Sequence, residues 1–113
     1  MTQKDKELLL KDLCCRLPYG VYIQTKRYNI PIELRYISID NIPEIKPYLR
    51  PMLSMTEEEK EWLYSNFDYI ESFGIKCYDK IPEYYDWLNE HHFDYRGLIE
   101  KGLAIDCTNL DIY

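Results

Sequence analysis

The sequence predicts a single α+β domain over residues 1–113. One indication is a change near residue 20, where apolar spacings of three and four, typical of a helix, give way to the alternation typical of a strand. Helical spacing returns after a proline-rich stretch at residues 43–51. The length suffices for one hydrophobic core but not two. We therefore expect an N-terminal helix, a small antiparallel sheet and two or three C-terminal helices on one face of it.

The first predicted element is an amphipathic helix over residues 3–17. Its apolar stripe contains Leu9, Leu10, Leu13, Cys14 and Leu17. Thr2 suits the N-cap position, where a side-chain oxygen accepts a backbone N–H of the first turn. Pro18 and Gly20 should end the helix.

Alternating apolar residues then predict a β-hairpin within residues 21–40. Pro31 places the second run at a strand start or a sheet edge. One or two further short strands are expected, at residues 75–78 and 103–105. Residues 43–51 contain three prolines. Because proline cannot donate a backbone hydrogen bond, we expect neither a helix nor a central strand here, but an extended stretch that crosses the surface or covers an edge of the core.

Three helices are predicted in the second half. Thr56 and Glu59 match a capping box, so the first should begin there and end near residues 72–74. Its expected buried face contains Trp62, Leu63, Phe67 and Ile70. The second, over residues 82–92, should bury Ile81, Tyr84, Tyr85, Leu88 and His92 and turn Glu83, Asp86, Asn89 and Glu90 outward. A third should run from an Asp94 cap to Lys101, and residues 109–113 should form a loosely held tail.

The charge is distributed unevenly along the chain. Residues 1–56 contain nine Lys or Arg and six Asp or Glu, a net +3, and residues 57–113 contain five and fourteen, a net −9. The acidic second half and the twelve tyrosines favour a protein partner with a basic surface. The overall acidity argues against sequence-independent nucleic-acid binding. The contrast between the halves also favours a homo-oligomer.

Apolar runs and cysteines bear on the compartment. The longest apolar run near the N-terminus is Leu8 to Leu10, too short for a signal-peptide core or a membrane span. Cys14 and Cys15 are adjacent and bridge each other poorly. We therefore expect four reduced thiols, no membrane association and a cytoplasmic protein.

The densest polar cluster supplies candidate catalytic residues. His91, His92, Asp94, Tyr95 and Arg96 bring together groups used in general acid/base catalysis and in phosphate recognition. The same residues also suit a helix end, where His interacts with the helix dipole and Asp caps the next helix. A ligand-binding or hydrolytic domain built on this cluster is one alternative.

No metal or cofactor is expected. The cysteines and histidines lack the paired spacing that places two zinc ligands together, and the four glycines are scattered rather than gathered in a phosphate-binding loop.

The hairpin supplies candidate binding residues. Lys26, Arg27, Tyr28, Arg35 and Tyr36 place charge and aromatic rings together, an arrangement that binds nucleic acid or an acidic partner. Charges that protect an exposed sheet edge explain the same residues. A weak nucleic-acid binder is thus a second alternative.

Three segments resemble a group of small uncharacterised proteins from gut Bacteroides-type bacteria and their phages or mobile elements. They are DLCCRLPYGV at residues 12–21, IKPYLRPM with SMTEEE at residues 45–52 and 54–59, and HHFDYRGLIEKGLA at residues 91–104. The resemblance implies a bacterial or phage origin and brings no activity, cofactor or site residue with it. Without a catalytic constellation, the sequence favours a small non-enzymatic interaction or regulatory protein.

Overall fold

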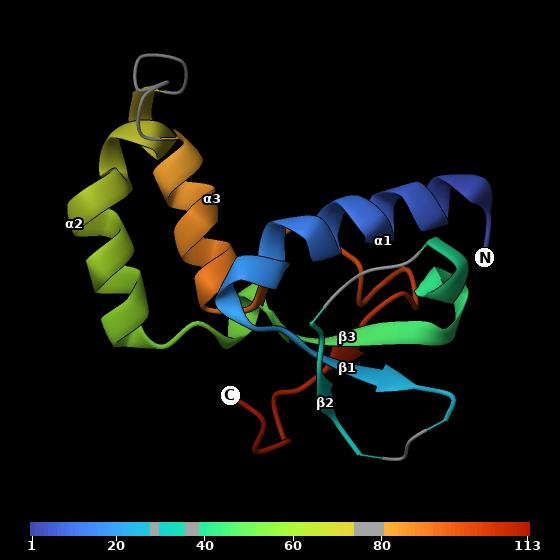
Figure 1. The fold of residues 1–113 in the computed structure, drawn as a ribbon. Helices are drawn as coiled ribbons and strands as arrows, with labels where there is room; N and C mark the ends of the chain where they lie inside the picture. The colour runs from blue at the N-terminus through green and yellow to red at the C-terminus, as the bar shows by residue number, and fades with distance from the viewer. Residues whose placement is uncertain (28–29, 36–38, 74–80) are drawn as a thin grey trace.

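The computed structural model describes residues 1–27, 30–35, 39–73 and 81–113. Helix α1 (Gln3–Arg16) crosses one face of a small sheet, and helices α2 (Glu57–Phe73) and α3 (Ile81–Glu90) stand beside it as a pair (Figure 1). The strands are β1 (Tyr22–Thr25), β2 (Ile32–Glu33), β3 (Ile45–Pro51), β4 (Phe93–Asp94) and β5 (Ile105–Asp106), and short 3-10 helices cover Leu17–Tyr19, Ile39–Glu44 and Met52–Ser54. The α+β class is confirmed. Across these described ranges, no helix has the length and apolar character needed to cross a membrane.

Strand β3 is the centre of the sheet. Strand β1 pairs antiparallel with its first half and carries β2 on its other edge, as the predicted hairpin requires. Strands β4 and β5 run parallel to the second half of β3. Parallel neighbours need a long crossover connection, which α2 and α3 supply between β3 and β4. The sheet is therefore mixed. Its antiparallel part consists of the predicted hairpin, β1 and β2, and of β3, a strand that the sequence did not predict.

The prediction that residues 43–51 form no central strand is wrong. Strand β3 runs from Ile45 to Pro51, and Pro43 lies in the preceding 3-10 helix. Pro47 is the last residue of β3 in register with β1, and Pro51 is the last in register with β4. Each strand proline therefore lies at the end of a ladder, where a missing N–H removes little pairing.

Two capping boxes fix helix starts where the sequence predicts them. The Thr2 hydroxyl accepts the Asp5 N–H at 3.1 Å, and the Asp5 carboxylate accepts the Thr2 N–H at 3.1 Å. At α2 the Thr56 hydroxyl accepts the Glu59 N–H at 3.1 Å, and the Glu59 carboxylate accepts the Thr56 N–H at 2.9 Å. Each box satisfies backbone donors that a helix leaves unpaired at its first turn.

The buried face of α1 differs from the predicted apolar stripe. Asp12 and Arg16 are fully buried beside Leu9 and Leu13, whereas Cys14 is exposed. Residues four apart share a helix face and residues two apart do not, so burial of positions 12 and 16 turns position 14 outward. Burial of these two charged side chains is possible because they neutralise each other, with Arg16 Nε 2.7 Å from Asp12 Oδ2.

The apolar side chains form two clusters. The main cluster joins α1 to the sheet and contains Leu9, Leu13, Val21, Ile23, Leu34, Ile42, Ile45, Leu49, Leu98, Leu103 and Ala104. The second lies where α2 and α3 meet the sheet and contains Trp87, Leu88 and Phe93, with Met52, Met55, Leu63, Tyr84 and Tyr95 packed against them. The helical pair is therefore attached to the sheet by its own, largely aromatic, contacts.

Several predictions for the helical pair need correction. Trp62 and Tyr85 are exposed rather than buried, and Asn89 is buried rather than turned outward. Asn89 tolerates burial because its side-chain oxygen accepts a hydrogen bond from the Tyr95 hydroxyl at 3.0 Å. The side chains of Phe67 and Ile70 and the whole of the strand predicted at residues 75–78 lie outside what the structure describes.

The predicted helix over residues 94–101 is absent from this described segment, where Asp94 belongs to strand β4 and turns follow. The Asp94 carboxylate still caps backbone donors, accepting the N–H groups of Leu98 and Ile99, each at 2.9 Å. Gly97 adopts a positive φ of 72°, a conformation that glycine takes without strain and that interrupts a right-handed helix.

The predicted loose tail is wrong at Tyr113. The Tyr113 hydroxyl accepts the Tyr22 N–H at 2.9 Å and donates to the Tyr48 carbonyl at 2.8 Å. In the β1–β3 register Ile23 faces Pro47, so Tyr22 and Tyr48 are next along the ladder. The hydroxyl thus bridges the two strands where their direct pairing stops.

We predict that Tyr113→Phe lowers the free energy of unfolding by about 1–3 kcal/mol, because it removes the hydroxyl and leaves two backbone groups without their partner. Urea denaturation would measure the change. The matched control is Tyr64→Phe, which alters an exposed ring and should change stability by less than about 0.5 kcal/mol. Equal stabilities of the two variants would show that the bridge contributes nothing.

Candidate functional site

Helices α2 and α3 concentrate negative charge. Their sequences contain nine Asp or Glu, six in α2 and three in α3, against one Lys, a net −8. The exposed carboxylates described on them, which we call the acidic face, are Glu57, Glu58, Glu61, Glu83, Asp86 and Glu90. Spacings of three and four place them on one side of each helix. The two helices therefore present a high density of negative charge, to which Asp86 contributes at the side of α3 that faces α1.

Aromatic rings are exposed on the same two helices. Trp62 is 44% exposed, Tyr64 56% and Tyr85 43%. Trp62 also stacks on the buried Trp87, with ring centroids 5.3 Å apart and planes inclined by 13°. Exposed Trp and Tyr rings are the side chains that most often anchor protein interfaces. The acidic helices thus combine charge with apolar contact area.

A second charged pair holds α2 against the sheet. Arg50 on β3 donates two hydrogen bonds to the Glu59 carboxylate, at 2.6 and 2.9 Å. Its guanidinium also lies 4.1 Å from the centre of the Phe93 ring. The hydrogen bond from Arg50 is the main reason that the pKa of Glu59 falls from 4.5 to about 2. Glu59 is therefore ionised at neutral pH and serves structure rather than the acidic face.

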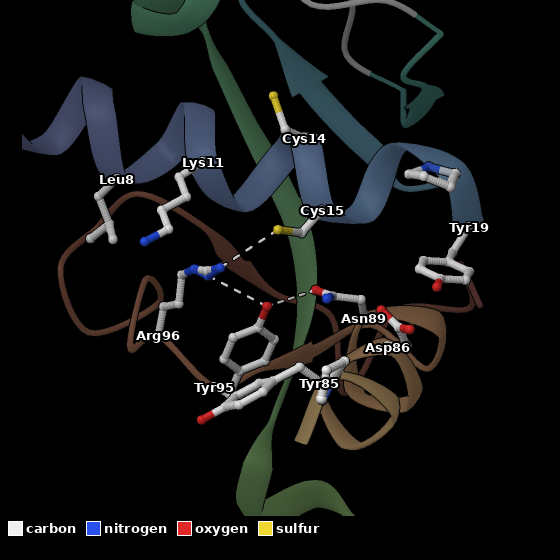
Figure 2. A pocket seen from close by; sticks show the side chains of 12 residues that line it. Leu8, Lys11, Cys14, Cys15, Tyr19, Tyr85, Asp86, Asn89, Tyr95 and Arg96 are labelled. Atoms are coloured by element: carbon white, nitrogen blue, oxygen red, sulfur yellow. Dashed lines mark hydrogen bonds between the residues drawn. The ribbon is translucent and has the colours of Figure 1, made fainter. Parts of the chain in front are cut away.

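A groove of about 770 Å³ lies between α1, α3 and the turn after β4 (Figure 2). Lys11 and Arg96 lie at one end, and Tyr19 and Asp86 at the other. Cysteine, tyrosine and asparagine side chains line the space between them. The volume is in the range of about 300–1,000 Å³ that small-molecule sites occupy.

A chain of hydrogen bonds crosses the groove. The Tyr95 hydroxyl donates to Asn89 Oδ1 at 3.0 Å and accepts from Arg96 Nη1 at 3.4 Å. Arg96 Nη2 donates to Cys15 Sγ at 3.7 Å, and the guanidinium lies 4.8 Å from the centre of the Tyr95 ring. These contacts set the orientation of Arg96.

The structure brings only Tyr95 and Arg96 of the five candidate catalytic residues into the groove. His91 stacks on Trp87 and its Nδ1 lies 2.9 Å from the Trp87 carbonyl oxygen. Asp94 caps the turn described above. The position of His91 at the end of α3 agrees with the helix-end interpretation, whereas Asp94 caps a turn instead of the helix expected there. The catalytic hypothesis remains a prediction.

His92 follows α3 in a left-handed conformation, with φ 66°, and stacks on Tyr113 with ring centroids 3.5 Å apart. Its Nδ1 is buried without a hydrogen-bond partner. Burial and then the positive charge of Arg16 lower the pKa of His92 from 6.5 to about 4, with smaller contributions from His91 and Arg50. The imidazole is therefore neutral at physiological pH and part of the Tyr113 packing.

The candidate residues of the basic hairpin are described in part. Lys26, Arg27 and Arg35 are exposed, while Tyr28 and Tyr36 lie outside the described residues. The hairpin therefore presents positive charge to solvent, and its predicted aromatic contribution is not placed.

Sequence reasoning missed the buried charges and the α1 side of the groove. Asp12 and Arg16 are spaced as a helical ion pair, a signal that the sequence contains, although such pairs are usually exposed. The position of Lys11 and Cys15 beside Arg96 joins residues about eighty positions apart, which no local pattern reports. Cys14, Cys15 and Cys107 are free thiols, and no group of three metal-ligating side chains occurs among the described residues.

Comparison with family models, curated proteins and solved structures finds no match to this chain. The resemblance to small Bacteroides-type proteins therefore remains a prediction.

The neutral His92 predicts a specific loss of stability in acid. The unfolded chain binds a proton on this side chain near pH 6.5, and the folded protein only near pH 4. Stability should therefore fall by about 1–2 kcal/mol as the pH drops from 7 to 4, allowing for partial solvent screening of the ring.

The measurement is the free energy of unfolding from pH 7 to pH 4 for the wild type and for His92→Asn, which does not titrate and tolerates a positive φ. The wild type should lose more stability than the variant over this range. His91→Asn, the matched control, should keep most of the wild-type dependence, because burial and Arg16 are the larger causes of the low pKa of His92. Parallel curves for the wild type and His92→Asn would contradict the assignment.

Proposed function

We propose that this protein is a non-enzymatic interaction module that binds a protein with a basic surface through the acidic face of α2 and α3. The observation that carries the proposal is the coincidence, on one pair of helices, of six exposed carboxylates with the exposed rings of Trp62, Tyr64 and Tyr85. Lys60 is the one basic residue in the sequences of α2 and α3, and its Nζ lies 3.4 Å from Glu57 Oε1. The field is thus only slightly compensated within the helices.

The two kinds of side chain have different roles in such binding. Carboxylates steer a basic partner toward the surface and set the orientation of the complex, with rates that fall as salt rises. Aromatic rings supply the buried contact area that determines how slowly the complex dissociates. A rigid attachment of the helices favours both roles because less side-chain and backbone freedom is lost on binding. The Arg50–Glu59 pair and the Trp62–Trp87 stack support that rigidity.

The alternatives have less geometric support among the described residues. A hydrolytic site at residues 91–96 would need its histidines beside Tyr95 and Arg96, whereas His91 and His92 lie in other contacts. A nucleic-acid site on the hairpin would rest on Lys26, Arg27 and Arg35 alone. A second copy of the chain is a candidate partner, since the first half has a net charge of +3. A cytoplasmic location stays a prediction.

Affinity capture from cells of the natural source would test the proposal with three forms of the protein. The first is the wild type, and the second is the variant Glu57→Gln/Glu58→Gln/Glu61→Gln. The third is a control of equal charge change, Glu7→Gln/Glu44→Gln/Glu100→Gln, whose positions are exposed and lie outside α2 and α3. A true partner should be retained by the wild type and the control and lost from the α2 variant.

With the purified partner, the α2 variant should bind about tenfold more weakly, and wild-type binding should weaken as salt rises from 50 to about 300 mM. Light scattering over the same salt range would show whether the partner is a second copy. Capture that is identical for all three forms, or no partner beyond background with a salt-independent monomer, would contradict the proposal.

A further inference from the structure

We propose that the groove between α1 and α3 binds a small organic anion that carries a planar ring, with the anionic group at the Lys11–Arg96 end. This site goes beyond the proposed protein interaction. Positive charge is in excess at that end, because two guanidinium groups, those of Arg16 and Arg96, share the single carboxylate of Asp12. Arg16 is 2.7 and 3.1 Å from the two oxygens of Asp12, and Arg96 Nε is left at 3.6 Å from Oδ1.

Lys11 increases the imbalance. It is exposed at the same end of the groove and has no acidic partner among the described residues. Lys11, Arg16, Arg96 and Asp12 together have a net charge of +2, from three positive groups and one negative, within a protein whose net charge is −6. A local positive potential beside an open groove attracts an anion.

The donors of Arg96 are weakly satisfied. Its hydrogen bonds to the Tyr95 hydroxyl and the Cys15 thiol are long, at 3.4 and 3.7 Å, and a thiol is a weak acceptor. A phosphate or carboxylate oxygen forms shorter and stronger hydrogen bonds with a guanidinium. The ring of Tyr95 meanwhile holds the guanidinium plane in place, which reduces the entropy lost when an anion binds.

A buried donor behind the groove is a separate observation in favour of an anion. Arg16 is fully buried, its Nη1 has no hydrogen-bond partner, and its guanidinium carbon lies 5.4 Å from the centre of the Tyr95 ring. Nη2 is satisfied by the Phe93 carbonyl oxygen at 2.7 Å. A buried N–H group without an acceptor is costly even when the guanidinium is ion-paired, and negative charge bound nearby would improve its electrostatic energy.

The remaining walls suit a ring. Tyr85 and Tyr95 lie with ring centroids 5.0 Å apart and planes inclined by 55°, and Tyr85 is 43% exposed. Asn89 and Asp86 offer polar groups farther along the groove (Figure 2). Asp86 repels an anion, so the ring or a polar substituent occupies that end and the charge occupies the other. The volume, about 770 Å³, accommodates such a molecule.

Titration of the ¹⁵N-labelled protein with three probes would test the site by NMR. Phenyl phosphate and phenylacetate have the same ring with different anionic groups, and inorganic phosphate lacks the ring. The two aromatic probes should shift the amide signals of Cys15, Asn89 and Arg96 with Kd values on the order of 1 mM or below. Inorganic phosphate should bind at least about tenfold more weakly. Whichever aromatic probe binds more tightly indicates whether the anionic group of the natural ligand is a phosphate ester or a carboxylate.

Three variants make the outcome decisive. Lys11→Gln, at an exposed position, should weaken both aromatic probes by about three- to tenfold, and Tyr85→Ala should reduce the advantage of the aromatic probes over inorganic phosphate. The control Lys46→Gln is exposed on β3 outside the groove and should leave the affinities unchanged. The proposal is overturned if the groove signals do not shift, if inorganic phosphate binds equally well, or if folded Lys11→Gln binds like the wild type. Because Lys11 lies outside α2 and α3, these results are separable from a failure of the acidic face.

Discussion

The buried ion pair between Asp12 and Arg16 is the interaction on which the arrangement of this fold depends. Both side chains are fully excluded from solvent, and two hydrogen bonds join them. Removal of each charge from water costs several kcal/mol, which is offset only when geometry and further hydrogen bonds are good. The bond from Arg16 to the Phe93 carbonyl supplies one of these and ties α1 to β4. The position of α1 on the sheet, and with it the groove beside α3, follows from this contact.

Two of the ion pairs among the described residues, Asp12–Arg16 and Arg50–Glu59, connect different parts of the fold. The Asp12–Arg16 pair is fully buried under α1, whereas Arg50–Glu59 lies at the partly exposed junction between the sheet and α2. Glu59 also completes the Thr56 capping box. Its carboxylate therefore both caps the N-terminus of α2 and attaches that helix to Arg50 of the sheet. Since Asp12 is shared with Arg96, the first pair leaves positive charge at the groove, while the acidic face of α2 and α3 presents the opposite sign. One small fold thus offers two surfaces of different chemistry.

Local signals in the sequence predicted the local structure well. Thr2 and Thr56 marked their helix starts, alternation marked the hairpin, and the α+β class followed from the order of these elements. Long-range contacts decided the rest. The prolines at residues 43–51 argued against a strand there. Three strands nevertheless pair with β3, whose two prolines lie where the pairing with a neighbour ends. Similarly, the burial of Asp12 and Arg16 and the anchoring of Tyr113 depend on partners distant in sequence. Of the groove, the sequence supplied Tyr95 and Arg96, and only the fold adds Lys11 and Cys15.

A double-mutant cycle between Asp12→Asn and Arg16→Met, followed by urea unfolding, tests most directly whether the buried pair organises the fold. Either single variant leaves a buried polar or charged group without its partner and should destabilise the protein by about 3–5 kcal/mol. The double variant should be more stable than the sum of the two losses predicts, with a coupling energy of about 2 kcal/mol or more. Losses that add to within about 0.5 kcal/mol would show that the two side chains act independently and would contradict the account.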